Sequence, residues 1–202
     1  LTRLLEKNSL ETFEREEIEA AITYLEKESS IHYDSIQKEA IIQAINKPLF
    51  ILTGGPGTGK TTVINGIIAV YALLHKLDLT KATGEVPILL AAPTGRAARR
   101  MNELTGLPSA TIHRHLGLTE DQGESYREDY LDADFIIVDE FSMVDTWLAN
   151  QLFQNISSNS QVLIVGDAEQ LPSVSPGQVL ADLLKIPALP SLTLEKIYRQ
   201  AE

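Results

Sequence analysis

The sequence predicts an α/β fold in which a parallel β-sheet is covered by helices on both faces. Four or five short apolar runs alternate with helix-like segments, which is typical of repeated βαβ units. The runs are continuously apolar, as expected for parallel strands that are buried on both sides. A glycine-rich sequence that suits phosphate binding follows the first run directly. The chain has 202 residues, enough for one sizeable α/β domain.

The sequence of the N-terminal part of the chain predicts helices. We expect residues 1–30 to form a helical linker or the end of an upstream helical domain, and residues 31–202 to form the α/β domain. An apolar stripe at helical spacing supports the first part: Ile18, Ala21, Ile22 and Leu25. Because the chain begins at leucine rather than methionine, we expect it to be a fragment of a longer protein.

The remaining elements follow from apolar runs, caps and breakers. Asp34 or Ser35 is expected to cap a helix that Pro48 ends. Strands are predicted over residues 49–52, 88–92, 135–138, 162–165 and 192–194, helices over 59–75, 94–101, 144–153 and 178–184, and a short helix or turn over 111–116. Residues 117–131 are acidic and predict an exposed loop. Right-handed crossovers would bring the polar ends of these strands to one edge of the sheet.

Residues 54–61 have the sequence GGPGTGKT, which fits the phosphate-binding pattern G-x-x-x-x-G-K-[ST]. Glycines let consecutive backbone N–H groups turn inward toward a phosphate, and the following helix directs its positive dipole end at the same anion. Lys60 would supply charge to the β- and γ-phosphates, and the hydroxyl of Thr61 would hold Mg²⁺. The predicted nucleotide-binding residues of this P-loop are Gly55, Pro56, Gly57, Thr58, Gly59, Lys60, Thr61 and Thr62. The alternative is a glycine-rich turn with a chance lysine.

An acidic pair, Asp139 and Glu140, closes the apolar run 135–138. Asp139 is predicted to hold Mg²⁺, and Glu140 to orient or deprotonate an attacking water. The other interpretation of this pair is a solvated strand end or a helix cap. The glutamate favours hydrolysis over transfer to another acceptor. A P-loop kinase remains an alternative, although we find no lid segment with clustered arginines.

Three further polar residues are candidates for the nucleotide site. The amide of Gln37 can both donate to and accept from an adenine edge. Gln170, in the polar loop after the run 162–165, could reach a γ-phosphate or its water. Arg199 could act as an arginine finger within the same chain. Taken singly, they would be a surface glutamine, an ordinary turn residue and an arginine at a fraying terminus.

The charge of the chain is uneven. The net charge of −11 opposes binding to nucleic acid, because phosphates attract a basic surface. Residues 93–116 nevertheless hold four arginines and two histidines against one acid, whereas residues 117–145 hold ten acids against one base. A protein that is acidic overall can still carry a local basic strip, and here the strip covers residues 94–100 and 113–114. His113 and His115 are spaced i, i+2, so on a helix they point apart and do not predict a metal pair.

The composition of the chain bears on the cellular compartment in which the protein is expected. The chain has no cysteine, which excludes disulfides and thiolate metal sites. No apolar run approaches the length of a membrane span, and no signal peptide is expected at the start. We expect a cytoplasmic protein without membrane contact.

Six motifs occur in order along the chain: GGPGTGKTT, APTGRAARRM, TIHRHL, IIVDEFSMVD, VGDAEQLPSVSPG and LEKIYRQ. Together they resemble the motor motifs of superfamily-one DNA helicases, and are most similar to the RecD-like family, the exodeoxyribonuclease V alpha-subunit type. The resemblance covers about residues 31–200. It implies that residues 31–202 form a RecA-like ATPase domain, the first of two motor domains.

The resemblance also implies roles for single residues. Gln37 would contact the adenine base. ATP and Mg²⁺ would be bound and processed by Lys60, Thr61, Asp139 and Glu140. The γ-phosphate would be sensed or contacted by Gln170 and Arg199. The stretches similar to those that contact single-stranded DNA contain Pro93, Thr94, Gly95, Arg96, Thr111, His113 and Arg114.

The implied function is that of an ATP-dependent motor that moves 5′ to 3′ on single-stranded DNA in recombination and repair. The implied partners are single-stranded DNA, a second RecA-like domain of the same parent chain and other subunits of a recombination complex. Because no second motor domain follows in this sequence, we expect the chain alone to bind nucleotide weakly, to hydrolyse it slowly if at all, and not to unwind DNA. A small-molecule kinase and a non-catalytic ATP-sensing module remain the alternatives.

Overall fold

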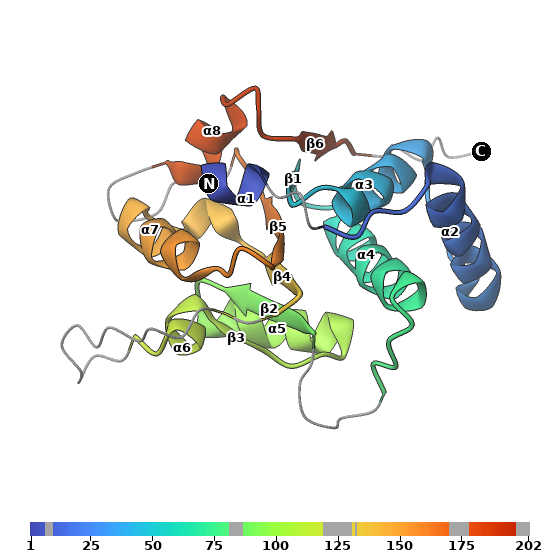
Figure 1. The fold of residues 1–202 in the computed structure, drawn as a ribbon, viewed down its shortest axis with the longest axis horizontal. Coiled ribbons are helices and arrows are strands. Elements are labelled where there is room, and N and C mark those ends of the chain that lie inside the picture. The colour runs from blue at the N-terminus through green and yellow to red at the C-terminus, as the bar shows by residue number, and fades with distance from the viewer. Residues whose placement is uncertain (7–9, 81–86, 119–130, 132, 170–177, 197–202) are drawn as a thin grey trace.

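A six-stranded, fully parallel β-sheet forms the centre of the computed structural model, which describes residues 1–6, 10–80, 87–118, 131, 133–169 and 178–196. The strand order is β3-β2-β4-β5-β1-β6. The strands are β1 (Leu49–Gly54), β2 (Ile88–Ala92), β3 (Ser109–Thr111), β4 (Phe135–Val138), β5 (Gln161–Gly166) and β6 (Ser191–Leu194). Helices lie on both sides of this sheet (Figure 1), so the predicted fold class is confirmed.

The central strands are buried on both faces, which explains their continuously apolar sequences. Every residue of β1, β4 and β5 is buried. Successive side chains of a strand point to opposite sides, so each strand supplies both halves of the core. In β1, Phe50 and Leu52 join one hydrophobic cluster, whereas Leu49 and Ile51 join the other.

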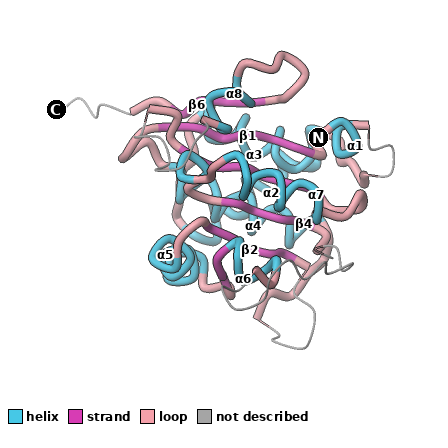
Figure 2. The backbone as a smooth tube through the Cα atoms, turned by 90° about the vertical axis from the view of Figure 1, so that its left-hand side faces the viewer, coloured by secondary structure: helices cyan, strands magenta, loops and turns pink. Residues whose placement is uncertain are grey.

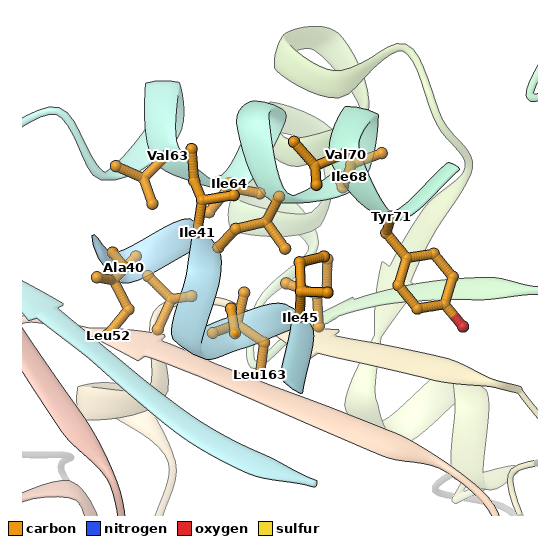
Figure 3. Close-up of a cluster of buried hydrophobic side chains, with 14 of the residues drawn as sticks. Ala40, Ile41, Ile45, Leu52, Val63, Ile64, Ile68, Val70, Tyr71 and Leu163 are labelled. Carbon is orange, nitrogen blue, oxygen red and sulfur yellow. The ribbon is translucent and has the colours of Figure 1, made fainter. Parts of the chain in front are cut away.

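The first face of the sheet is covered by α2 (Arg15–Ser29), α3 (Ser35–Asn46), α4 (Lys60–Leu74) and α5 (Gly95–Thr105). Figure 3 shows Ile41 and Ile45 of α3 lying between α4 and the strand that carries Leu163. Helix α4 begins directly after the P-loop, and its buried residues include Val63 and Ile67. This packing holds α4 in place, with its N-terminus at the carboxyl edge of the sheet.

The second face is covered by α1 (Thr2–Leu5), α6 (Ile112–Leu116), the 3₁₀ helix η1 (Phe141–Met143), α7 (Thr146–Asn155) and α8 (Val179–Leu184). Figure 2 looks onto the sheet and shows its strands running side by side, overlapped by the helices of the two layers. Phe141 is fully buried in this layer. The chain after β4 is therefore held tightly against the sheet.

The N-terminal segment packs onto the same core as the rest of the chain. The apolar stripe predicted in this segment is confirmed, since Ile18, Ala21 and Ile22 are buried with residues of α3 and α4. Residues 10–14 are not helical, so the helical segment predicted over residues 1–30 is divided into α1 and α2 in the described part of the chain. The domain boundary near residue 30 stays a prediction.

Most predicted elements appear within a few residues of their expected bounds. The predicted Asp34 cap is confirmed, because its carboxylate accepts the N–H of Gln37 at 2.8 Å. Strand β3 was not predicted, because its three residues carry no long apolar run. The helix predicted from residue 144 begins at Thr146, because η1 comes first and Asp145 caps α7. Among the described residues, no helix has the length and apolarity that crossing a membrane requires.

Helix α3 is anchored at both ends. At its start, the side chain of Gln37 completes a capping box by accepting the N–H of Asp34 at 3.0 Å. At its end, the amide of Gln161 in β5 donates to the carbonyls of Ala44, Ile45 and Lys47 at 2.6, 2.9 and 3.1 Å. These carbonyls have no partner within the helix, so Gln161 provides what the helix end lacks.

We predict that Gln161→Ala lowers the free energy of unfolding by about 1–3 kcal/mol, because buried carbonyls would lose their donor. Urea denaturation of the wild type and the variant measures the change. Gln154→Ala on the exposed side of α7 is the control, expected to stay within about 0.5 kcal/mol. Equal stability of both variants would show that the three carbonyl contacts do not stabilise the fold.

Candidate functional site

The P-loop connects β1 to α4 and is closed by contacts within itself. The hydroxyl of Thr58 donates to the carbonyl of Gly55 at 2.7 Å, and Thr58 is buried. A Cβ atom at Gly54 would lie 2.5 Å from the Thr58 hydroxyl and 3.1 Å from the Cβ of Leu194. The first glycine of the motif is therefore required for space.

Gly59, the residue before α4, has a φ of +88°, a conformation that L side chains rarely adopt. A Cβ atom there would also lie 2.7 Å from the amide nitrogen of Gln37. The structure thus brings the predicted adenine reader, buried at the start of α3, against the P-loop. Its amide oxygen already accepts the N–H of Asp34.

Lys60 lies in the first turn of α4, and its side chain folds back over the loop. Its ammonium group donates to the carbonyls of Gly54 and Gly55, the second at 2.9 Å. An ammonium has three donors, so it is held above the loop with capacity for another acceptor. The next residues in the turn are Thr61, which is half-buried, and Thr62, which is exposed.

Asp139 stands at the carboxyl end of β4, where its N–H donates to the carbonyl of Ala91 at 3.0 Å. Burial raises the pKa of its carboxyl, and the charge of Glu140 acts in the same direction. The N–H of Glu140, at 2.8 Å from Asp139 Oδ1, and the charges of Lys60 and Arg100 oppose this rise in pKa. The charges of Lys60 and Glu140 are thus close enough to Asp139 to affect the pKa of its carboxyl.

Glu140 has a left-handed backbone, with φ +53° and ψ +37°. A non-glycine residue in this region carries strain, which the surrounding structure must overcome. Two contacts explain how it does so: Phe141 is fully buried, and its backbone approaches Gly166 so closely that a Cβ there would meet the Phe141 nitrogen at 3.4 Å. The backbone therefore leaves the extended conformation of β4 at Glu140.

Sequence reasoning assigned no role to Asp167, which the structure buries at the carboxyl end of β5. Strand β5 lies between β1 and β4, so Asp167 stands between the P-loop strand and the Asp139 strand. Its Oδ1 accepts the N–H of Glu169 at 3.0 Å. An acid at the end of the apolar run 162–165 was the available signal for this residue.

The predicted DNA-contacting residues lie at the starts of α5 and α6. Thr94 caps α5 and Thr111 caps α6, each through its hydroxyl. The Cα atoms of Ala92 and Thr111 are register partners in neighbouring strands, so both helices begin side by side at the carboxyl edge. Arg96, on the first turn of α5, is exposed, as are His113 and Arg114 of α6. Pro93 is half-buried and Gly95 is exposed.

The two remaining candidates, Gln170 and Arg199, lie outside the described residues. His115 points inward, with Nε2 2.8 Å from the carbonyl of Leu90, whereas the ring of His113 faces Trp147. The two histidines therefore point apart, as their spacing predicts.

The P-loop and the acidic pair at one edge of a parallel sheet are the arrangement of a P-loop ATPase domain. Residues 37–176 match the family described as AAA domain. The chain belongs to this family. The matched range of this AAA domain includes the P-loop, the acidic pair and the starts of α5 and α6.

The resemblance to RecD-like helicases is confirmed by curated relatives of this AAA domain. It is 38% identical over 168 residues to the ATP-dependent RecD2 DNA helicase of Deinococcus radiodurans, covering 82% of this chain and 21% of the relative. It is also 38% identical over 168 residues to the RecBCD enzyme subunit RecD of Mycolicibacterium smegmatis, covering 74% of this chain and 30% of the relative. The chain thus spans between a fifth and a third of these relatives.

Solved structures support the fold of the AAA domain. Pif1 helicase from Candida albicans superposes with a TM-score of 0.57 at 24% identity, covering 84% of this chain and 41% of that one. Unliganded Pif1 from a Bacteroides species gives a TM-score of 0.53 at 23% identity, covering 85% and 43%. At this identity the likeness concerns the RecA-like fold alone.

The site offers few protein ligands to a metal ion. Among the described residues no group of three or more histidine, cysteine or acidic side chains gathers as a metal site. A carboxylate at Asp139 and a hydroxyl at Thr61 instead fit Mg²⁺, which usually keeps several waters and takes its other oxygens from the phosphates of a bound nucleotide.

We predict that Gly59→Ala lowers the affinity for a fluorescent ATP analogue about tenfold, because the left-handed backbone and the contact with Gln37 both resist a Cβ atom. Gly106→Ala is a matched control, since Gly106 has a φ of +71° at the end of α5 but nothing within 4 Å of the added Cβ. It should cost stability and leave nucleotide affinity unchanged. Equal affinities of both variants would contradict a special role for position 59.

Proposed function

We propose that this AAA domain is the first RecA-like motor domain of a 5′–3′ DNA helicase or translocase that acts in recombination and repair. ATP hydrolysis here would drive movement along single-stranded DNA. The observation that carries the proposal is the shared carboxyl edge of β1, β2, β3 and β4, which brings the P-loop and the acidic pair to the same edge as the helix starts that hold Arg96 and Arg114.

ATP would lie over the P-loop, with its phosphates on the backbone N–H groups at the start of α4. The ammonium of Lys60, held by two loop carbonyls, would move its donors to the β- and γ-phosphates. Gln37 would contact the base through its amide N–H₂, since its oxygen already accepts from Asp34. The proposed nucleotide-binding set is Gln37 together with residues 55–62.

Mg²⁺ held by Thr61 and Asp139 would supply charge neutralisation between the phosphates. Glu140 would orient the attacking water and take its proton. Its left-handed backbone turns it out of the strand at the end of β4, beside Asp139. Gln170 and Arg199 would sense the γ-phosphate, a role that rests on the helicase motifs alone.

DNA would follow the basic strip over Thr94–Arg100 and His113–Arg114. The exposed arginines 96, 99 and 100 all come from α5, whose N-terminus also favours an anion. The proposed DNA-contacting set is Pro93, Thr94, Gly95, Arg96, Thr111, His113 and Arg114. A local positive strip of this kind is compatible with a net charge of −11.

The motor would need partners to complete its cycle. We propose a second RecA-like domain in the same polypeptide, which would close the ATP cleft, and further subunits of a recombination complex. The names of the curated relatives support this, since several are subunits of a RecBCD enzyme. A cytoplasmic location fits a DNA motor of this kind.

Glu140→Gln should preserve ATP binding and reduce turnover by at least about 10²-fold, because the amide cannot accept the proton of water. Steady-state phosphate release and binding of a fluorescent ATP analogue, measured in the polypeptide that carries both motor domains, separate the two effects. Glu16→Gln, the same charge change on an exposed part of α2, is the control. Unchanged turnover in Glu140→Gln would remove Glu140 from the mechanism.

Replacing Arg96 and Arg114 together by glutamine should weaken binding to a single-stranded oligonucleotide. It should also make the affinity less dependent on salt. The slope of log affinity against log salt concentration should become shallower by about 0.7 for each phosphate that no longer pairs with an arginine. Fluorescence anisotropy at several salt concentrations measures both. Lys27 and Lys185, two exposed lysines away from the strip, give the control when both become glutamine. A common slope for the two double variants would mean that DNA does not follow the strip.

A further inference from the structure

Trp147 is the only tryptophan of the chain and is 54% exposed. It lies in the first turn of α7, where Asp145 caps the helix by accepting the N–H of Leu148 at 2.7 Å. Leu148 and Leu152 anchor the same helix in the core. A rigid helix therefore holds a large aromatic ring in solvent.

A second aromatic ring lies close by. The ring of His113, from α6, has its centroid 6.4 Å from that of Trp147, with the planes tilted by 34°. By comparison, the stacked rings of Tyr71 and His75 are 4.1 Å apart. Met143, in the 3₁₀ helix just before α7, is 44% exposed. The Trp147 ring is thus bordered by His113 but not covered by it.

Exposed basic side chains lie beside this ring on α6, whereas the nearby carboxylate of Asp145 is engaged in capping α7. Helix α6 carries the exposed residues His113 and Arg114, and α7 has no charged residue between Thr146 and Asn155. Helix α6 starts beside α5, because Ala92 and Thr111 are register partners, so the aromatic pair continues the proposed basic strip. An aromatic face beside arginines is how proteins bind single-stranded nucleic acid, with bases stacked and phosphates paired.

We infer that Trp147 is a base-stacking platform for single-stranded DNA, with His113 at its edge. This inference rests on the proposed function, and extends the DNA path from α5 and α6 onto α7. A base would lie on the exposed indole face, while Arg114 would pair with the adjoining phosphate.

A short, well-packed segment joins the platform to Glu140, the proposed general base. The N–H of Met143 donates to the carbonyl of Glu140 at 3.0 Å, and that of Val144 to the carbonyl of Phe141 at 3.0 Å. Phe141 and Val144 are buried. Residues 140–147 therefore connect the ATP site to the base platform without a flexible loop.

The single tryptophan makes a direct test possible. Intrinsic fluorescence of the 202-residue chain should be quenched saturably by an oligothymidylate of about 15 nucleotides, because a stacked base quenches indole emission. An oligonucleotide of the same length with abasic sugars at every position should bind more weakly and leave the emission unchanged. Quenching by both oligonucleotides, or by neither while both bind, would overturn the inference.

Substitution provides the matching affinity test by anisotropy of the labelled oligonucleotides. Trp147→Ala should lose about tenfold in affinity for oligothymidylate, and Trp147→Phe should lose less than about threefold. The salt slope should stay unchanged, since stacking releases no counterions, and wild type and Trp147→Ala should bind the abasic strand equally. Tyr24→Ala, which removes an aromatic ring that is 52% exposed on α2, is the control.

The outcomes separate this inference from the proposed function. If oligothymidylate binds in a salt-dependent way but Trp147→Ala binds it as well as wild type, the inferred base-stacking platform is wrong and the proposed DNA motor stands. Trp147 would then be a contact for another protein surface. If no single-stranded oligonucleotide binds at low salt, the proposed function fails together with the platform.

Discussion

The parallel pairing of six strands, whose central members are buried between two helical layers, is the constraint on which the rest of the structure depends. Parallel strands all end at the same edge, so every βα connection delivers its polar residues there. The P-loop, Asp139, Asp167 and the starts of α5 and α6 come from five different strands. They meet because the strands share one direction.

The P-loop depends on close packing as much as on its glycines. Thr58 fills the space beside Gly54, and Gln37 fills the space beside Gly59. Gln37 is itself held by the cap of α3, whose far end is held by Gln161 of β5. The nucleotide loop is thereby supported by a helix that is attached to the middle of the sheet.

The segment that follows β4 combines strain with tight packing. Glu140 adopts a left-handed backbone, and the buried Phe141 and the close approach to Gly166 stabilise it. The same segment continues through η1 into α7 and its exposed tryptophan. The strain is concentrated at Glu140, the proposed general base, a few residues before the exposed ring, which is consistent with a site where two functions are joined.

The sequence by itself determined five of the six strands, the P-loop, the acidic pair and two candidates for the cap of α3. These depend on local signals: continuous apolar runs, glycine spacing, and an Asp three residues before a Gln. Likewise, the basic strip could be recognised from composition. Only the tertiary structure decided the order of the strands, the short edge strand β3, the backbone of Glu140, the burial of Asp167 and the approach of His113 to Trp147. Gln161 illustrates the reason, because its amide serves carbonyls more than a hundred residues earlier in the chain, at Ala44 and Ile45. Such contacts arise from the packing of distant segments, and no local pattern of residues encodes them.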